Sequence, residues 1–248
     1  MKTNTLLTVA AVLVTSLMAL HAGPKEDAIA ASKKLVAKSY AWKTSTENAG
    51  GQGGQGGGGR GFGGGNQEGK IGEDGLATVS VVGAQSTTEA VVKGEKVVVK
   101  QEEGWQTLDE IMANAQGGGQ GGGRGRFGAF AFRNFKAPAV RALELIDQTK
   151  ELKEADGAFS GELTEAGAKA LMTFGGRGGG AGPEISGAKG SIKLWVKEGM
   201  LTKMETQVKG TISFNGNDRE IDRKVTTEFK EVGTTKVTAP EDAKKKLQ

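Results

Sequence analysis

The chain has 248 residues, a formal net charge of +4, one histidine and no cysteine. The lack of cysteine excludes disulfides and thiol nucleophiles, and the single histidine argues against common zinc sites and against Ser-His catalysis. The small positive charge gives no indication by itself of a nucleic-acid or anionic-lipid partner.

The N-terminus predicts a signal peptide over residues 1–22. Lys2 precedes an apolar run from Leu6 to Leu20, and Leu20-His21-Ala22 has the form of a cleavage site. Cleavage after Ala22 would remove Lys2 and the only histidine, and the loss of this lysine lowers the formal charge from +4 to +3. Because no cysteine is present for acylation, we expect a soluble periplasmic or secreted protein.

Three glycine-rich tracts, at 50–66, 117–128 and 175–182, interrupt what we expect to be one domain over 23–248. Such tracts bury too little apolar surface to offset backbone entropy, so we expect disordered insertions in surface loops. Their arginine, glycine and phenylalanine residues resemble RNA-binding segments. Export would separate them from cytoplasmic RNA, and no nucleic-acid partner is expected.

The first half of the chain predicts a helix at 24–38, with Ala28, Ile29, Ser32, Leu35 and Val36 on one face. Strands are expected at 40–46, 76–82, 87–93 and 96–101, the last two joined by a turn at 94–95. A short helix at 107–115 begins with a capping box made by Thr107 and Glu110.

The second half predicts a helix at 138–148, a hairpin at 151–163 that turns at Asp156-Gly157, and a helix at 164–172. A long β-meander follows at 190–229, with turns at Glu198-Gly199 and Asn215-Gly216. Residues 234–238 predict a last edge strand. This order of elements predicts an α+β fold in which helices gather on one side of an antiparallel sheet.

The meander alternates apolar and polar residues, so its sheet has one apolar face and one charged face. Long twisted strands curl, and the apolar face must be filled by helices, by another sheet or by a ligand. Thr44, Thr46, Thr202 and Thr206 interrupt this face, which favours a loosely filled hollow. The inward residues could line a lipid cavity or equally form an ordinary core; they are Tyr40, Trp42, Leu194, Val196, Met200, Met204, Val208, Ile212, Phe214, Ile221, Val225 and Phe229.

Several segments, in their order along the chain, resemble the periplasmic lipoprotein-carrier superfamily, which includes LolA-type sorting proteins and LppX-type lipid-binding lipoproteins. The resemblance implies an unclosed β-barrel, a strongly curved antiparallel sheet whose concave face is covered by helices and holds acyl chains. It also implies an arginine that stabilises the closed form; Arg141 or Arg223 could take this role, and no motif selects between them. The segments are Ser39-Tyr40-Ala41-Trp42, residues 157–164, residues 192–199, Thr226-Thr227-Glu228-Phe229 and residues 237–243.

The function expected from these features is that of a non-enzymatic periplasmic carrier, with no cofactor, metal or catalytic residues. Its partners would be a lipid or lipoprotein acyl chain and membrane components of the envelope. The alternative is a structural or surface-interaction module with a closed core and glycine-rich contact loops. A hydrolase comes third, since acidic pairs such as Glu102-Glu103 or Glu151-Glu154 show no convergence across a cleft.

Overall fold

The computed structural model describes residues 23–48, 66–83, 87–116, 129, 132–133, 135–173, 184–214 and 216–248. The predicted signal peptide at 1–22 lies outside these residues. So do the three glycine-rich tracts, apart from Asn66.

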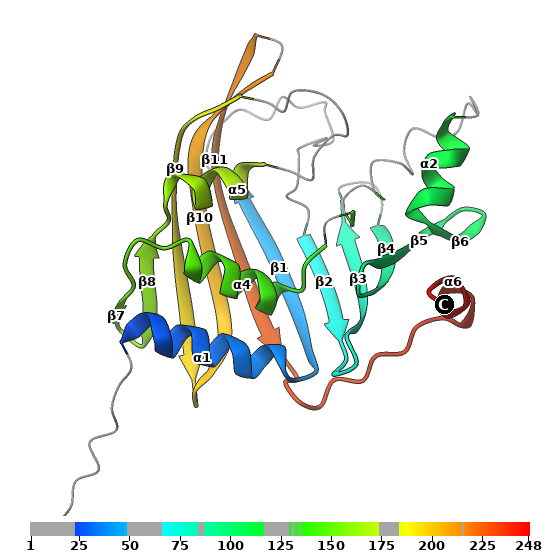
Figure 1. Ribbon diagram of the computed structural model, residues 1–248, viewed down its shortest axis with the longest axis horizontal. Helices are drawn as coiled ribbons and strands as arrows, with labels where there is room; N and C mark the ends of the chain where they lie inside the picture. Colours follow the sequence, from blue (N-terminus) through cyan, green and yellow to red (C-terminus); the bar gives the residue numbers. More distant parts are fainter. Residues whose placement is uncertain are drawn as a thin grey trace, which may run out of the picture.

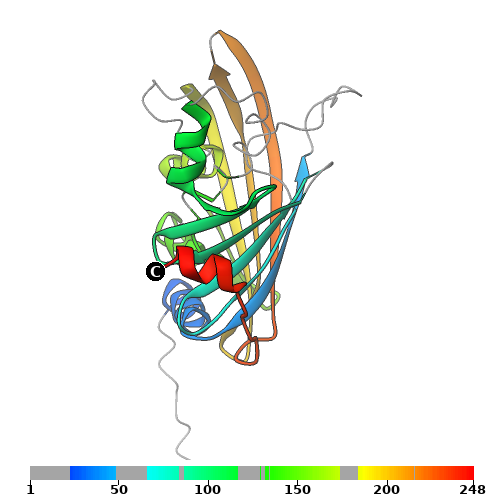
Figure 2. The same ribbon diagram turned by 90° about the vertical axis from the view of Figure 1, so that its right-hand side faces the viewer.

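One antiparallel sheet of eleven strands dominates the described part of the chain, in the order β6-β5-β4-β3-β2-β1-β11-β10-β9-β8-β7. The end strands β6 and β7 do not pair with each other, so the sheet is an unclosed barrel, and Figure 2 shows its strong curvature. This confirms the expected fold class. The strands are β1 (Tyr40–Asn48), β2 (Asn66–Ile71), β3 (Leu76–Val82), β4 (Thr87–Lys93), β5 (Lys96–Gln101), β6 (Gly104–Thr107), β7 (Lys153–Ala155), β8 (Ala158–Glu162), β9 (Glu184–Lys197), β10 (Met200–Phe214) and β11 (Asn217–Lys230).

Helices α1 (Pro24–Val36), α4 (Pro138–Asp147) and α5 (Glu165–Met172) cover the concave face of the sheet (Figure 1). Helix α2 (Leu108–Gln116) lies beyond them at the β6 end. The last helix, α6 (Glu241–Lys246), was not expected from the sequence. It packs on the outer face of the sheet, where Ala243 meets Val91 and Val98.

Helix α1 buries Ala28, Ala31, Ser32 and Leu35 against the sheet and α4. These positions follow a spacing of three and four residues, which gives a narrow apolar stripe. Val36 was expected on the same face, but it lies at the edge of this stripe and is 42% exposed.

Two strands were missed and one expected strand is wrong. Strand β2 has an almost wholly polar sequence, and backbone pairing with β1 and β3 holds it in the sheet. The short strand β6 pairs with β5. Residues 234–238 form a turn and loop instead of an edge strand, because the backbone N–H groups of Thr234 and Thr235 donate to the carbonyl of Glu231.

An irregularity in β10 changes which side chains face inward at its start. The register against β9 shifts between Leu201 and Lys203. Strict alternation from Met204 would place Met200 inward, yet Leu201 is fully buried (0% exposed) and Met200 is only half-buried. A bulge places two residues opposite one and so breaks the period of two.

Candidate functional site

The predicted inward residues of the central strands share one face of the sheet. Met204 is paired with Leu194 on β9 and with Thr227 on β11. Farther along β10, Thr206 pairs with Val225, and Val208 pairs with Arg223. Paired residues in an antiparallel sheet project to the same side, and this side carries α1, α4 and α5.

Half of the twelve predicted lining residues are packed core in this structure. Each is at most 6% exposed and belongs to the cluster that joins the sheet to the helices: Tyr40, Trp42, Leu194, Met204, Val208 and Phe229. The sequence left a cavity and a core as equal alternatives, and this part of the face is filled by side chains.

An aromatic cluster fixes α4 and the segment before it to the sheet. The rings of Tyr40 and Phe229 meet edge to face with centroids 5.6 Å apart, and Trp42 stacks on Phe135 at 6.1 Å. The backbone N–H of Ala139, at the start of α4, donates to the Tyr40 hydroxyl at 3.3 Å. Burial raises the pKa of Tyr40 to about 12, although the bond from Ala139 opposes the shift.

A second part of the concave face is less fully covered. Val196, Met200, Ile212, Ile221 and Val225 are half-buried, and the Phe214 side chain lies outside the described atoms. Of the five, all except Val225 pack against the core cluster. Among the described residues, Val225 is therefore the one of these five without packing against the core cluster.

Threonines surround Val225 on the inner face. Thr46 and Thr206 are its partners on β1 and β10. The next inward-facing pair of β1 and β11 is Thr44 and Thr227, whose hydroxyl oxygens lie 3.0 Å apart, within hydrogen-bond range. Thr202 was expected on the inner face as well. It lies at the other end of β10, where its hydroxyl donates to the backbone carbonyl of Trp195 on β9.

Arg223 joins the sheet to α5. Its side chain is 7% exposed, and its guanidinium donates to the carbonyl oxygen of Leu171 near the end of α5. Burial, and secondarily the charge of Arg141, lower the pKa of Arg223 to about 10. Of the two arginines that the sequence left as alternatives, Arg223 is the one bonded from the sheet to a helix among the described residues. The role of either arginine in stabilising a closed form stays a prediction.

Arg141 lies on α4, one of the helices that cover the same face. Its side chain is accessible to solvent, yet the surrounding protein atoms partly desolvate the guanidinium and lower its pKa. The negative charge of Glu144 acts in the opposite direction and raises this pKa. Because its charge also acts on Arg223, the two guanidiniums lie on the same side of the sheet. We refer to Thr46, Thr206, Arg223, Val225 and Thr227 as the hollow floor, after the hollow expected from the sequence; Thr206, Arg223 and Thr227 are themselves buried. Sequence reasoning missed Thr227, although its position in the β11 alternation could have found it.

A groove of about 350 Å³ lies on the other side of the sheet, over β1, β2 and β3. Five of its ten lining residues are lysine or glutamate, and two of these, Lys43 and Glu68, form an ion pair at 2.6 Å. Its chemistry differs from that expected of an acyl-chain site.

In the described ranges, no three His, Cys, Asp or Glu side chains gather as metal ligands would. Over the same ranges, every helix is too short or too polar to cross a bilayer.

No protein-family model matches the chain, and no curated protein matches it. Among solved structures it is similar to LprF from Mycobacterium bovis, with 13% identity, coverage of 88% of this chain and 96% of that chain, and a TM-score of 0.44. It is similar to the lipoprotein LppX from Mycobacterium tuberculosis, with 10% identity, 87% and 96% coverage, and a TM-score of 0.44. A LolA superfamily protein from Nitrosomonas europaea has 8% identity, 87% and 93% coverage, and a TM-score of 0.30.

Proposed function

We propose that this protein binds the acyl chain of a lipid or lipoprotein on its concave face and carries it, without catalysing a reaction. The supporting observation is that the apolar inner face extends past the fully buried residues to the half-buried Ile212, Ile221 and Val225. An aliphatic chain laid against these residues would gain about 0.8 kcal/mol for each methylene removed from water.

Loading in this proposal requires α5 to move away from the sheet. The bond from Arg223 to Leu171 and the close approach of Met172 to Gly210 hold the helix where it is. A ligand that displaces α5 would break the Arg223 bond. The freed guanidinium could then donate to a carboxylate, phosphate or ester oxygen of the bound lipid, because a buried cation needs a hydrogen-bonding partner.

The location is part of the same proposal. Residues 1–22 would direct export, and the chain, which contains no cysteine, would act as a soluble carrier in the periplasm. Membrane components of the envelope would be its donor and acceptor.

The competing function is a structural module with a closed core. The packing of Leu194, Met204 and Val208, each at most 5% exposed, favours this alternative. It predicts that no part of the concave face accepts an apolar ligand.

Native mass spectrometry of protein purified from its own periplasm separates these two functions. The carrier proposal predicts an additional lipid mass that organic extraction removes, and uptake of a fluorescent fatty acid by the extracted protein. A bare polypeptide mass together with no uptake of the fatty acid would favour the structural module.

A further inference from the structure

The outer face of the sheet carries a tryptophan whose surroundings differ from those of Trp42. Trp195 on β9 is half-buried, and its register partners Ala158 on β8 and Lys203 on β10 place it on the side away from the core cluster. Trp42 donates its indole N–H to Gln67 at 3.4 Å. The indole N–H of Trp195 has no acceptor among the residues that the structure describes.

Two lysines contact the ring of Trp195. The ammonium of Lys203 lies 4.4 Å from the ring centroid, and that of Lys193 lies 5.1 Å from it. Both distances fall in the range of cation–π attraction. The two positive charges are therefore held over the ring of Trp195.

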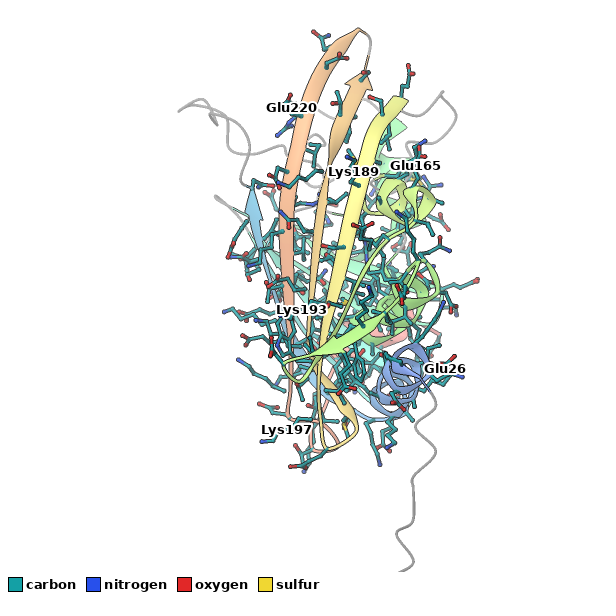
Figure 3. The ribbon with its side chains drawn as sticks, turned by 90° about the vertical axis from the view of Figure 1, so that its left-hand side faces the viewer. Glu26, Glu165, Lys189, Lys193, Lys197 and Glu220 are labelled. Atoms are coloured by element: carbon teal, nitrogen blue, oxygen red, sulfur yellow. The ribbon has the colours of Figure 1, made fainter. Side chains whose placement is uncertain are left out.

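These lysines belong to a larger basic surface. Lys189, Lys193 and Lys197 recur every fourth residue along β9 and follow one another down the strand in Figure 3. With the described residues, neither these three nor Lys203 forms an ion pair. We call Trp195 and the four lysines the Trp195 patch.

The acidic residues nearest to the patch in register already have other partners. Glu205, opposite Lys193, forms an ion pair with Lys224 at 3.3 Å. Glu228, opposite Lys203, forms one with Lys230 at 3.0 Å. Glu198, in the turn after Lys197, is the remaining acidic neighbour along the chain. The carboxylate of Glu228 also interacts with the charge of Lys203, which is therefore partly compensated. The Trp195 patch as a whole still carries more positive than negative charge.

We propose that the Trp195 patch is a docking surface for an anionic lipid bilayer. Tryptophan side chains favour the headgroup level, where the ring is partly buried and its N–H meets a polar acceptor. Each lysine near an anionic surface adds electrostatic attraction. The patch and the hollow floor lie on opposite faces of the sheet, so docking does not depend on lipid binding in the hollow.

Vesicle co-sedimentation of the mature chain tests this proposal. The vesicles are phosphatidylcholine alone or phosphatidylcholine mixed with phosphatidylglycerol. The test variant is Lys193→Gln/Lys203→Gln, and the matched control is Lys70→Gln/Lys236→Gln, which removes the same charge from lysines outside the patch. Lys189→Gln/Lys197→Gln repeats the test without altering the contacts to the Trp195 ring. Melting temperatures establish that each variant is folded.

We expect the wild type to bind the anionic vesicles and not the neutral ones. Affinity should fall by more than about tenfold in both patch variants and stay within about twofold in the control. Trp195→Thr should also weaken binding. Inorganic phosphate at the lipid-phosphate concentration should not compete, since a single anion cannot contact the whole patch.

Three results would overturn the proposal. The first is failure of the wild-type protein to sediment with anionic vesicles. The second is a loss of affinity in the control variant as large as in the patch variants, which would indicate diffuse charge attraction. Binding to polyglutamate without binding to vesicles would indicate an acidic protein partner instead. Fatty-acid uptake by the same variants is a separate readout, because the patch lies on the face opposite the hollow.

Discussion

The indole of Trp42 on β1 lies over Gly69, its register partner on β2, so closely that a Cβ at position 69 would fall 2.2 Å from Cζ2 of the ring. A glycine in a strand interior usually weakens the strand. Here it makes room for the largest side chain of the aromatic cluster under α4.

Gly69→Ala should therefore destabilise the protein by about 1–3 kcal/mol, because the ring must shift within a packed cluster. Thermal melting measures the effect. The neighbouring Lys70→Ala, on the exposed face of the same strand, serves as a control and should change stability little. Equal melting temperatures for the two variants would show that the indole can move aside freely.

Tyr40 is the only tyrosine in the chain, so absorbance at 295 nm follows its ionisation alone. Its folded-state pKa is raised from 10.0 to about 12. The stability that this shift represents, about 3 kcal/mol, is fully present below pH 10 and is lost as pH rises through 12. We expect a midpoint near pH 12 in the native protein and near 10 in denaturant. A native midpoint near 10 would contradict the burial of the phenol, and Tyr40→Phe should flatten the alkaline loss of stability.

The contact between Glu110 on α2 and Lys246 on α6 should be sensitive to acid. The carboxylate of Glu110 accepts from Lys246 and from the backbone N–H of Thr107 (2.8 Å), and these bonds lower its pKa. The folded pKa is depressed, so the stabilisation is present above the ordinary pKa of 4.5 and is lost as pH falls below it. Glu110→Gln should lower the melting temperature at pH 7 by more than it does at pH 3. A constant difference between the two proteins across this range would exclude the ionic contribution.

Replacing Arg223 by methionine should loosen α5. The substitution removes the donor to the Leu171 carbonyl while keeping an apolar chain of similar length. Hydrogen exchange should accelerate at the end of α5 and stay unchanged in α1. Arg219→Met on the same strand is the matched control, since Arg219 is exposed. Equal protection of α5 in both variants would mean that other contacts hold the helix.

Local signals in the sequence predicted much of the fold. Glu198 and Gly199 have φ of 55° and 71°, as a tight hairpin turn requires. The capping box at α2 is present, with the amide of Glu110 donating to the Thr107 hydroxyl at 3.2 Å. Such contacts involve residues close in the chain, and the spacing of residue types is sufficient to identify them.

Features that depend on contacts between residues far apart in the sequence could not be predicted from local patterns. Strand β2 was missed because Gly69 and its polar neighbours lack an apolar alternation, and β1 and β3 hold it in place. Leu201 was missed because the bulge is visible only in the pairing with β9. Arg223 was one of two candidate arginines, and its carbonyl partner lies 52 residues away in the chain.

The sharpest test of the carrier proposal compares two substitutions on the same concave face. Met204 belongs to the packed core at 5% exposure, so Met204→Glu should destabilise strongly by burying a carboxylate. Val225 is half-buried among threonines and lies outside the core cluster, so Val225→Glu should fold.

Binding of a fluorescent fatty acid, measured on wild type and on Val225→Glu with melting as the control for folding, is the decisive measurement. The proposal predicts saturable binding by the wild type and a loss of at least about tenfold in affinity for the folded Val225→Glu, because the carboxylate opposes entry of the acyl chain. No binding by the wild type, or unchanged binding by Val225→Glu, would contradict an acyl-chain site on the hollow floor.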